Sequence, residues 1–291
     1  RQLLDKRRSE LADEWARYGE NADLAEAMHT CLAWDTVYDP KHDRNVSPVS
    51  RTWAVGHGGY VLFCWDTFFA GWMASDRNPD LAAANALEIL NEATDDGFVP
   101  NYAYATGQRS RDRSQPPVGS MAVRAIYEST GMRWLLEEAF DKLLGWNRWW
   151  PRARDWDGLL CWGSNPYEPT YGNDWETRGV GETFGGALES GLDNSPMYDG
   201  VPFDAERGLM ALADVGLNGL YVADCEALAE IARVLGRPEQ AELEERRDRY
   251  ASNLDRLWDD DSGIYKNLRM DTGEFSNRLS PTNFYPLISR V

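Results

Sequence analysis

Two acidic side chains, Glu189 and Asp193, lie four residues apart in a segment that opens with Gly185-Gly186. Glycines allow tight backbone paths close to a ligand. Two carboxylates in an aromatic cleft can divide acid and base chemistry, because desolvation raises the pKa of one while the other stays ionised. The pair therefore predicts general acid–base catalysis. In the alternative, one of the two, Glu189 more readily than Asp193, caps a helix or holds the loop.

Aromatic side chains accompany acids elsewhere in the chain. Trp65 precedes Asp66, Phe69 follows one helical turn later, and Trp162 lies in the longest stretch between expected helices. An indole ring can cover the apolar C–H face of a sugar while a carboxylate accepts hydrogen bonds from its hydroxyls. These four residues are candidate sugar contacts, as is Glu189. The alternative for Asp66 is an acid in the first turn of a helix, where the helix dipole favours it.

A proline-stiffened stretch supplies directional polar groups. Asn101, Arg113 and Gln115 precede Pro116-Pro117. Amide and guanidinium groups on a rigid loop suit a ligand with many hydroxyls. The three arginines within residues 109–113 could pair with a carboxylate of a ligand, since arginine suits bidentate carboxylate recognition. They could equally serve solubility at the surface.

These residues lie between, or at the start of, segments with helical periodicity. Asn78-Pro79 places a cap before a proline at the first helical position, and Gly236 ends one helix before Pro238 opens another. Apolar residues at helical spacing predict helices over 3–18, 23–35, 61–75, 79–92, 118–129, 133–150, 213–236 and 238–258, with a ninth from about 283.

The links between these helices alternate strictly between short and long. The long links are residues 36–60, 93–117, 151–212 and 259–282. Short links form antiparallel helical hairpins, so every long link is expected on one face, and loops of such length are usually functional. The pattern predicts an all-α fold, an (α/α)6 barrel built as a toroid of helical hairpins. An open helical solenoid is the alternative.

Six hairpins close such a toroid, whereas four and the start of a fifth are counted here. Residues 1–291 are therefore expected to form a single domain that lacks its last helices, as a piece of a longer chain.

Composition narrows the functional classes. The chain has 30 Lys and Arg against 48 Asp and Glu, and the net charge of −18 disfavours binding to nucleic acid or an anionic membrane surface. No segment approaches the ~18 apolar residues of a membrane span. Four isolated cysteines and three histidines give no metal-site spacing, and no cofactor is expected. Unpaired cysteines favour the cytoplasm, although a trimmed N-terminus would have removed a signal. The sequence does not indicate any protein partner.

Taken together, the motifs resemble two groups of glycosidases. The run at residues 189–196 looks like glycoside hydrolase family 63, which includes processing α-glucosidases and bacterial hydrolases of mannosyl- and glucosylglycerate. Residues 280–287 are similar to a later segment of that family, and the resemblance covers about residues 58–291. The trehalase-like motifs are Trp65-Asp66, Val99-Pro100-Asn101 and Arg113-Ser114-Gln115-Pro116-Pro117.

The resemblance implies an (α/α)6 barrel that hydrolyses an α-linked sugar with inversion, with Asp193 as the general acid. The general base of the family is a glutamate in the last part of the barrel, which is expected beyond residue 291, with Glu182 or Glu189 as a substitute. The residues implied around the −1 sugar are Trp65, Asp66, Asn101, Arg113 and Gln115.

The expected function is an inverting glycoside hydrolase that removes an α-linked glucosyl or mannosyl unit from a small sugar or sugar conjugate. One alternative is a non-catalytic carbohydrate-binding relic of the same fold. The other is an α-helical scaffold whose aromatic loops are covered by a protein partner. Calorimetry separates the first two, because the relic binds sugar without forming product.

Overall fold

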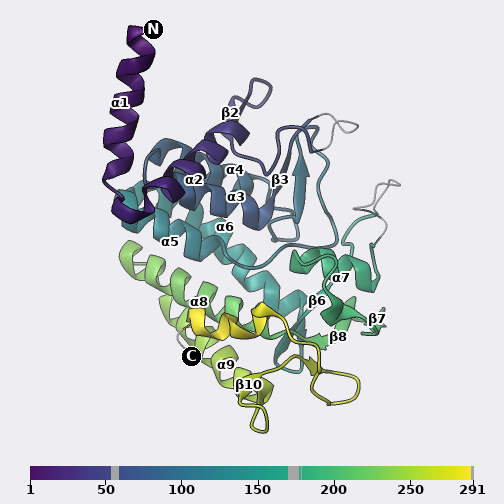
Figure 1. The fold of residues 1–291 in the computed structure, drawn as a ribbon. Helices are drawn as coiled ribbons and strands as arrows, with labels where there is room; N and C mark the ends of the chain where they lie inside the picture. Colours follow the sequence, from purple (N-terminus) through teal and green to yellow (C-terminus); the bar gives the residue numbers. More distant parts are fainter. Residues whose placement is uncertain (54–58, 170–176, 178, 290–291) are drawn as a thin grey trace.

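The computed structural model describes residues 1–53, 59–169, 177 and 179–289. Within these residues, helices lying side by side supply most of the body of the fold, and the N-terminal helix projects from it (Figure 1). None of the described helices is long and apolar enough to cross a membrane. The α-helices are α1 (Gln2–Ala16), α2 (Ala22–Asp35), α3 (Cys64–Ala74), α4 (Pro79–Asn91), α5 (Gly119–Thr130), α6 (Arg133–Ala153), α7 (Thr183–Ser190), α8 (Val215–Leu235) and α9 (Gln240–Leu254).

Local signals explain where several helices begin and end. Asn78 caps α4 by accepting a hydrogen bond from the Leu81 N–H at 3.1 Å, and α8 ends at Gly236 with a φ of +71°. A left-handed residue after the last turn is the usual helix stop, and glycine adopts it without a steric penalty. The predicted scaffold helices are therefore confirmed, with ends shifted by a few residues.

Two predicted helices differ from the observed elements, one at its start and the other in its type. The one expected over 61–75 starts as a strand, β3 (Val61–Phe63), and becomes α3 only at Cys64, because β3 pairs with β4 (Tyr102–Tyr104). The ninth helix is the 3₁₀ helix η5 (Pro281–Ser289). Pro286 lies inside it, and a proline ring has no N–H to donate to an α-helical ladder.

The long links are more structured than an all-α fold predicts. Their strands form small antiparallel sheets, of which the largest has five strands and brings parts of two long links together. All five residues of β6 and all five of β8 are buried, so neither strand shows the alternation of apolar and polar residues that marks a half-buried strand. The strands of this sheet are β5 (Asp155–Trp156), β6 (Leu159–Gly163), β7 (Phe203–Asp204), β8 (Leu209–Ala213) and β11 (Leu268–Arg269).

The other strand pairings in the long links are shorter. The segment between β5 and β6 is a two-residue hairpin turn, in which Asp157 and Gly158 both have positive φ, as hairpin turns of type I′ require. The other strands are β1 (Val37–Asp39), β2 (Arg44–Val46), β9 (Trp258–Asp259) and β10 (Ile264–Tyr265). Figure 1 shows β3, α7 and the strands β6–β8 together at one end of the helices.

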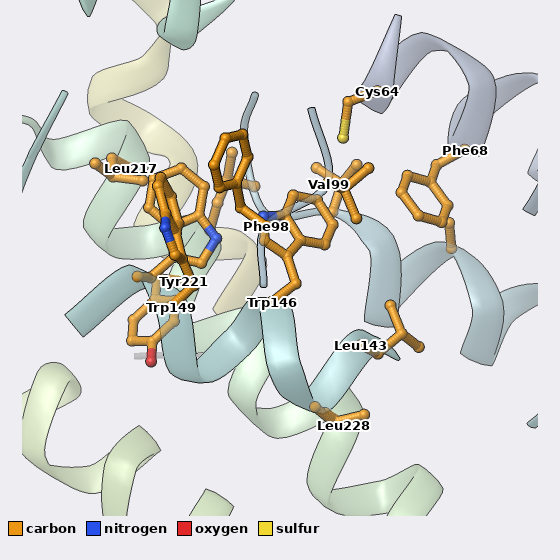
Figure 2. Close-up of a cluster of buried hydrophobic side chains, with 14 of the residues drawn as sticks. Cys64, Phe68, Phe98, Val99, Leu143, Trp146, Trp149, Leu217, Tyr221 and Leu228 are labelled. Carbon is orange, nitrogen blue, oxygen red and sulfur yellow. The ribbon is translucent and has the colours of Figure 1, made fainter. Parts of the chain in front are cut away.

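The core connects the helices to this end. One continuous cluster of buried apolar side chains includes residues from Leu32 to Leu257. Within it Trp146 of α6 stacks on Phe68 of α3, with ring centroids 5.9 Å apart and planes at 10° (Figure 2). The Trp146 indole N–H donates to Ser114 Oγ at 2.9 Å, so a core side chain fixes the loop that carries several predicted site residues.

Candidate active site

A pocket of about 320 Å³ lies where three long links meet. This volume is within the usual range for small-molecule sites. Five predicted residues line it: Trp65, Asp66, Asn101, Gln115 and Asp193. The convergence agrees with the prediction that the long links share one face of the helical scaffold. The other lining residues are Val49, Trp53, Phe63, Leu188 and Gly191.

Trp65 is positioned by its own helix and by two neighbours. It lies in the first turn of α3, where its backbone N–H donates to the Gln115 side-chain oxygen at 3.1 Å. Its indole ring lies against Gly191, the residue that ends α7 with a φ of +70°. A Cβ at Gly191 would come 2.5 Å from Trp65 Cζ2, so only glycine permits this approach.

The two carboxylates of the pocket have perturbed acidities. Burial raises the pKa of Asp66 to about 6, and the negative charge of Asp193 adds to this rise. Burial also raises the pKa of Asp193, while the positive charge of Arg113 partly offsets that effect. Carboxyl groups that hold a proton more tightly than usual are suited to donating it to a leaving group.

Arg113 does not line the pocket but lies behind it. Its side chain is completely buried, and its Nε donates to Asn101 Oδ1 at 3.2 Å. One terminal nitrogen donates to both carboxylate oxygens of Asp112, at 3.0 and 2.9 Å. Arg113 is therefore placed to orient Asn101, and its charge acts on Asp193, although its side chain does not line the pocket that was expected to hold the sugar.

Glu189 is fully buried inside the protein, which argues against direct contact with a sugar. Its side chain has no exposed surface and forms an ion pair with Arg154, whose side chain is equally buried. Arg154 Nε and Nη2 donate at 2.7 and 2.9 Å, and the backbone N–H groups of Ser114 and Gly163 donate at 2.9 and 2.7 Å. Glu189 thus ties α7 to β6 and to the 93–117 link, as the loop-holding alternative proposes.

Two aromatic candidates take positions beside the pocket. Trp162 is buried on β6 and lines a separate small cavity, which also touches Trp65. Phe69 lies one turn after Trp65 on α3, with ring centroids 6.0 Å apart, and lines an adjoining hollow together with Asp66. Neither ring lines the pocket itself.

The remaining charged candidates also lie outside the pocket wall. Glu182 is exposed just before α7. Arg109 donates to the Glu92 carbonyl oxygen at 3.0 Å, and Arg111 pairs with Glu168 at 2.5 Å. The two arginines line a different hollow, so a carboxylate held by the pocket would not meet them directly.

Two aromatic lining residues were not predicted. Trp53 lies in the 36–60 link and Phe63 in β3, and their rings meet edge to face with centroids 5.3 Å apart. The available signal was the position of Trp53 within a long link close to Trp65. Arg154 was also not predicted, because its partner Glu189 lies 35 residues away in sequence.

The sequence profile of the mannosylglycerate hydrolase MGH1-like glycoside hydrolase domain matches residues 59–291. The mannosylglycerate hydrolase of Rubrobacter radiotolerans is 26% identical to this chain, over 74% of this chain and 55% of its own length. Mannosylglycerate hydrolase MGH1 of Selaginella moellendorffii is 25% identical, over 49% of this chain and 31% of its own. The chain thus spans about half, or less, of the length of these relatives.

Solved structures share the fold. The family 63 mannosylglycerate hydrolase from Thermus thermophilus in complex with Tris superimposes with a TM-score of 0.71 at 19% identity, covering 92% of this chain and 73% of that one. Neutral trehalase Nth1 from Saccharomyces cerevisiae gives 0.61 at 18%, covering 87% and 54%. Both are α/α-barrel proteins, which agrees with the predicted architecture. The family profile matches residues 59–291, which is most of this chain, and the chain therefore belongs to the family of mannosylglycerate hydrolase MGH1-like glycoside hydrolase domains.

Proposed function

We propose that this chain forms the sugar-binding and acid-donating part of an inverting glycoside hydrolase, within a single α/α-toroid unit. Its substrate is a small sugar or sugar conjugate that carries an α-linked glucosyl or mannosyl group. The observation that carries the proposal is the pocket itself, in which Trp65 and Asp66 of α3 meet Asn101, Gln115 and Asp193 from two long links.

In this mechanism Asp193 is the general acid. Burial keeps its carboxyl group protonated to a higher pH than usual because it raises the pKa, and the proton passes to the glycosidic oxygen as the bond to the leaving group breaks. Trp65 offers a ring face to the sugar, and Asp66 and Asn101 offer polar atoms to its hydroxyl groups. A second carboxylate, about 6.5–9.5 Å from the acid, activates water on the opposite face of the sugar.

The general base of this proposal is a glutamate in the last part of the family's barrel, in sequence after residue 291. Glu189 is a poor substitute, because its side chain is buried and, within the described part of the chain, accepts its hydrogen bonds from Arg154 and from two backbone N–H groups. Glu182 is exposed and does not line the pocket.

The names of the relatives make hexosylglycerates the first substrates to test. We would incubate the purified protein with α-mannosylglycerate, α-glucosylglycerate and trehalose and record proton NMR spectra over time. The proposal predicts that sugar moves the tryptophan indole resonances and that any free hexose forms first as the β-anomer, because inversion of an α-bond yields β-product.

The outcomes separate the parts of the proposal. Initial release of the α-anomer would refute inversion. Changes in tryptophan resonances without product would mean a sugar site without its general base, which either a protein lacking the proposed glutamate or the carbohydrate-binding relic would give. Absence of any response to all three sugars would refute the pocket as a site for these α-glycosides.

A further inference from the structure

A small cavity lies next to the pocket and shares one wall with it. Trp65 lines both spaces. The cavity has a volume of about 10 Å³, which is about the space that one water molecule needs. Its wall includes Trp162 of β6, Tyr198 of the 3₁₀ helix η3 (Pro196–Tyr198), and Asp214, the residue that caps α8.

Three polar atoms of this wall are buried and have no hydrogen-bond partner among the described residues. They are Trp162 Nε1, the Tyr198 hydroxyl and Asp214 Oδ2, and each side chain is more than nine-tenths buried. The Tyr198 hydroxyl lies close enough to Ser190, which lines the same cavity, to interact with it, but the two do not reach hydrogen-bond geometry. The other Asp214 oxygen is engaged, since it accepts the Leu217 N–H at 2.8 Å. Buried polar groups are nearly always paired, so three unpaired atoms around one cavity indicate a bound partner.

The Trp162 indole lies near Asp214 but does not form a well-aligned hydrogen bond with it. Its N–H dipole partly opposes the burial that raises the pKa of Asp214, so the two groups are close enough to interact. Neither Trp162 Nε1 nor Asp214 Oδ2, however, reaches hydrogen-bond geometry with an atom of the residues that the structure describes. A donor and an acceptor that face one cavity without meeting are the arrangement that a bridging water satisfies.

The chemistry of these atoms selects the partner. An indole N–H can only donate a hydrogen bond, an ionised carboxylate can only accept one, and a phenol can do both. A metal cation would be repelled by the Trp162 N–H, and an anion by Asp214. A ligand that accepts and donates at once, and that fits about 10 Å³, is a single water molecule.

We propose that this cavity binds one ordered water molecule, which accepts from Trp162 Nε1, donates to Asp214 Oδ2 and bonds the Tyr198 hydroxyl. The water joins β6, η3 and the start of α8. Tyr198 and Leu192 belong to the segment that carries Asp193, and Leu192 also lines the cavity. The water therefore acts as a positioning group beside the candidate acid and the ring of Trp65.

A crystal structure of the unaltered protein gives the first test. We expect a density peak about 2.7–3.2 Å from Trp162 Nε1 and about 2.5–3.0 Å from the Tyr198 and Asp214 oxygens. A direct hydrogen bond between Trp162 and Asp214 with no peak beside it would overturn the proposal. A peak at the much shorter distances of a metal–oxygen bond, or the larger density of an organic molecule, would also overturn it.

NMR tests the same site in solution and needs no turnover, so it is independent of the proposed function. The indole N–H of Trp162, assigned by comparison with Trp162→Phe, should show a cross-peak to a long-lived water. Tyr198→Phe should shift this resonance and weaken the cross-peak. The matched control is Tyr221→Phe, which removes another buried hydroxyl, one that donates to the Asn147 carbonyl at 2.9 Å.

The comparison of the two variants decides the outcome. A Trp162 resonance that responds to Tyr198→Phe but not to Tyr221→Phe supports the shared water. A resonance without a water cross-peak in the unaltered protein, or with the same response to both variants, contradicts it.

Discussion

Replacing Glu189 by alanine removes the acceptor of four hydrogen bonds behind the candidate pocket. Two come from Arg154, at 2.7 and 2.9 Å, and two from the backbone N–H groups of Ser114 and Gly163. Both charged side chains have no exposed surface. The variant therefore leaves the Arg154 charge buried without its carboxylate, which costs about 3–5 kcal/mol of unfolding free energy for such pairs.

Thermal unfolding measures this cost. At about 2–4 °C per kcal/mol for a chain of this size, Glu189→Ala should lower Tm by about 6–20 °C. The control is Glu168→Ala, which removes the partner of Arg111 at 2.5 Å, in a pair whose side chains are 45% and 43% exposed. An exposed pair contributes about 0–1 kcal/mol, so this control should barely change Tm.

Two results would refute this reasoning. If Glu189→Ala lowers Tm no more than Glu168→Ala does, the buried pair does not hold the loops together. If Glu189→Ala unfolds like the unaltered protein but loses sugar hydrolysis, then Glu189 acts on the substrate, and its assignment as an internal tie is wrong.

The remaining predictions concern the pocket wall. Burial raises the pKa of Asp66 from 3.8 to about 6. Between these pH values the folded state holds a proton that the unfolded state has released, so the free energy of unfolding falls as the pH rises through this window. Asp66→Asn should therefore raise Tm relative to the unaltered protein at pH 7.5 but not near pH 4. An equal difference in Tm between the two proteins at both pH values would contradict the raised pKa of Asp66. Gly191→Ala should weaken sugar binding and cost about 1–3 kcal/mol beyond its backbone strain, because the new methyl group would meet Trp65 at 2.5 Å. Gly236→Ala is the matched control, because its φ of +71° is nearly the same and no atom lies within 4 Å of the added Cβ. Calorimetry measures sugar binding and thermal unfolding measures stability. Equal losses of stability and of binding in the two variants would exclude a clash with Trp65.

The helical scaffold was predictable because its signals are local. Asn78, Pro79 and Gly236 mark helix ends through short-range hydrogen bonding and backbone freedom. The strands of the long links were missed because β6 and β8 are short apolar runs, which periodicity cannot separate from loop or helix. Their pairing joins residues about fifty positions apart, as in Cys161 with Ala213.

The site was predictable in part for a similar reason. Trp65, Asp66 and Asp193 were predicted from residue types beside glycines and helix starts, and these residues do line one pocket. The sequence did not show that Glu189 lies on the buried side of a short helix, α7, so it was grouped with Asp193, although only Asp193 reaches the pocket. The difference depends on Arg154, whose contact with Glu189 exists only in the folded chain.

The central claim is that Asp193 donates the proton to the leaving group. The measurement is kcat/KM of a protein that includes the proposed general base, with and without Asp193→Asn, on two substrates with the same sugar. One is a hexosylglycerate, and the other is a glycosyl fluoride whose leaving group needs no proton. The account predicts a loss of about 10²–10⁴-fold on the hexosylglycerate and a much smaller loss on the fluoride. Equal losses on both substrates, or nearly full activity of Asp193→Asn on the hexosylglycerate, would contradict it.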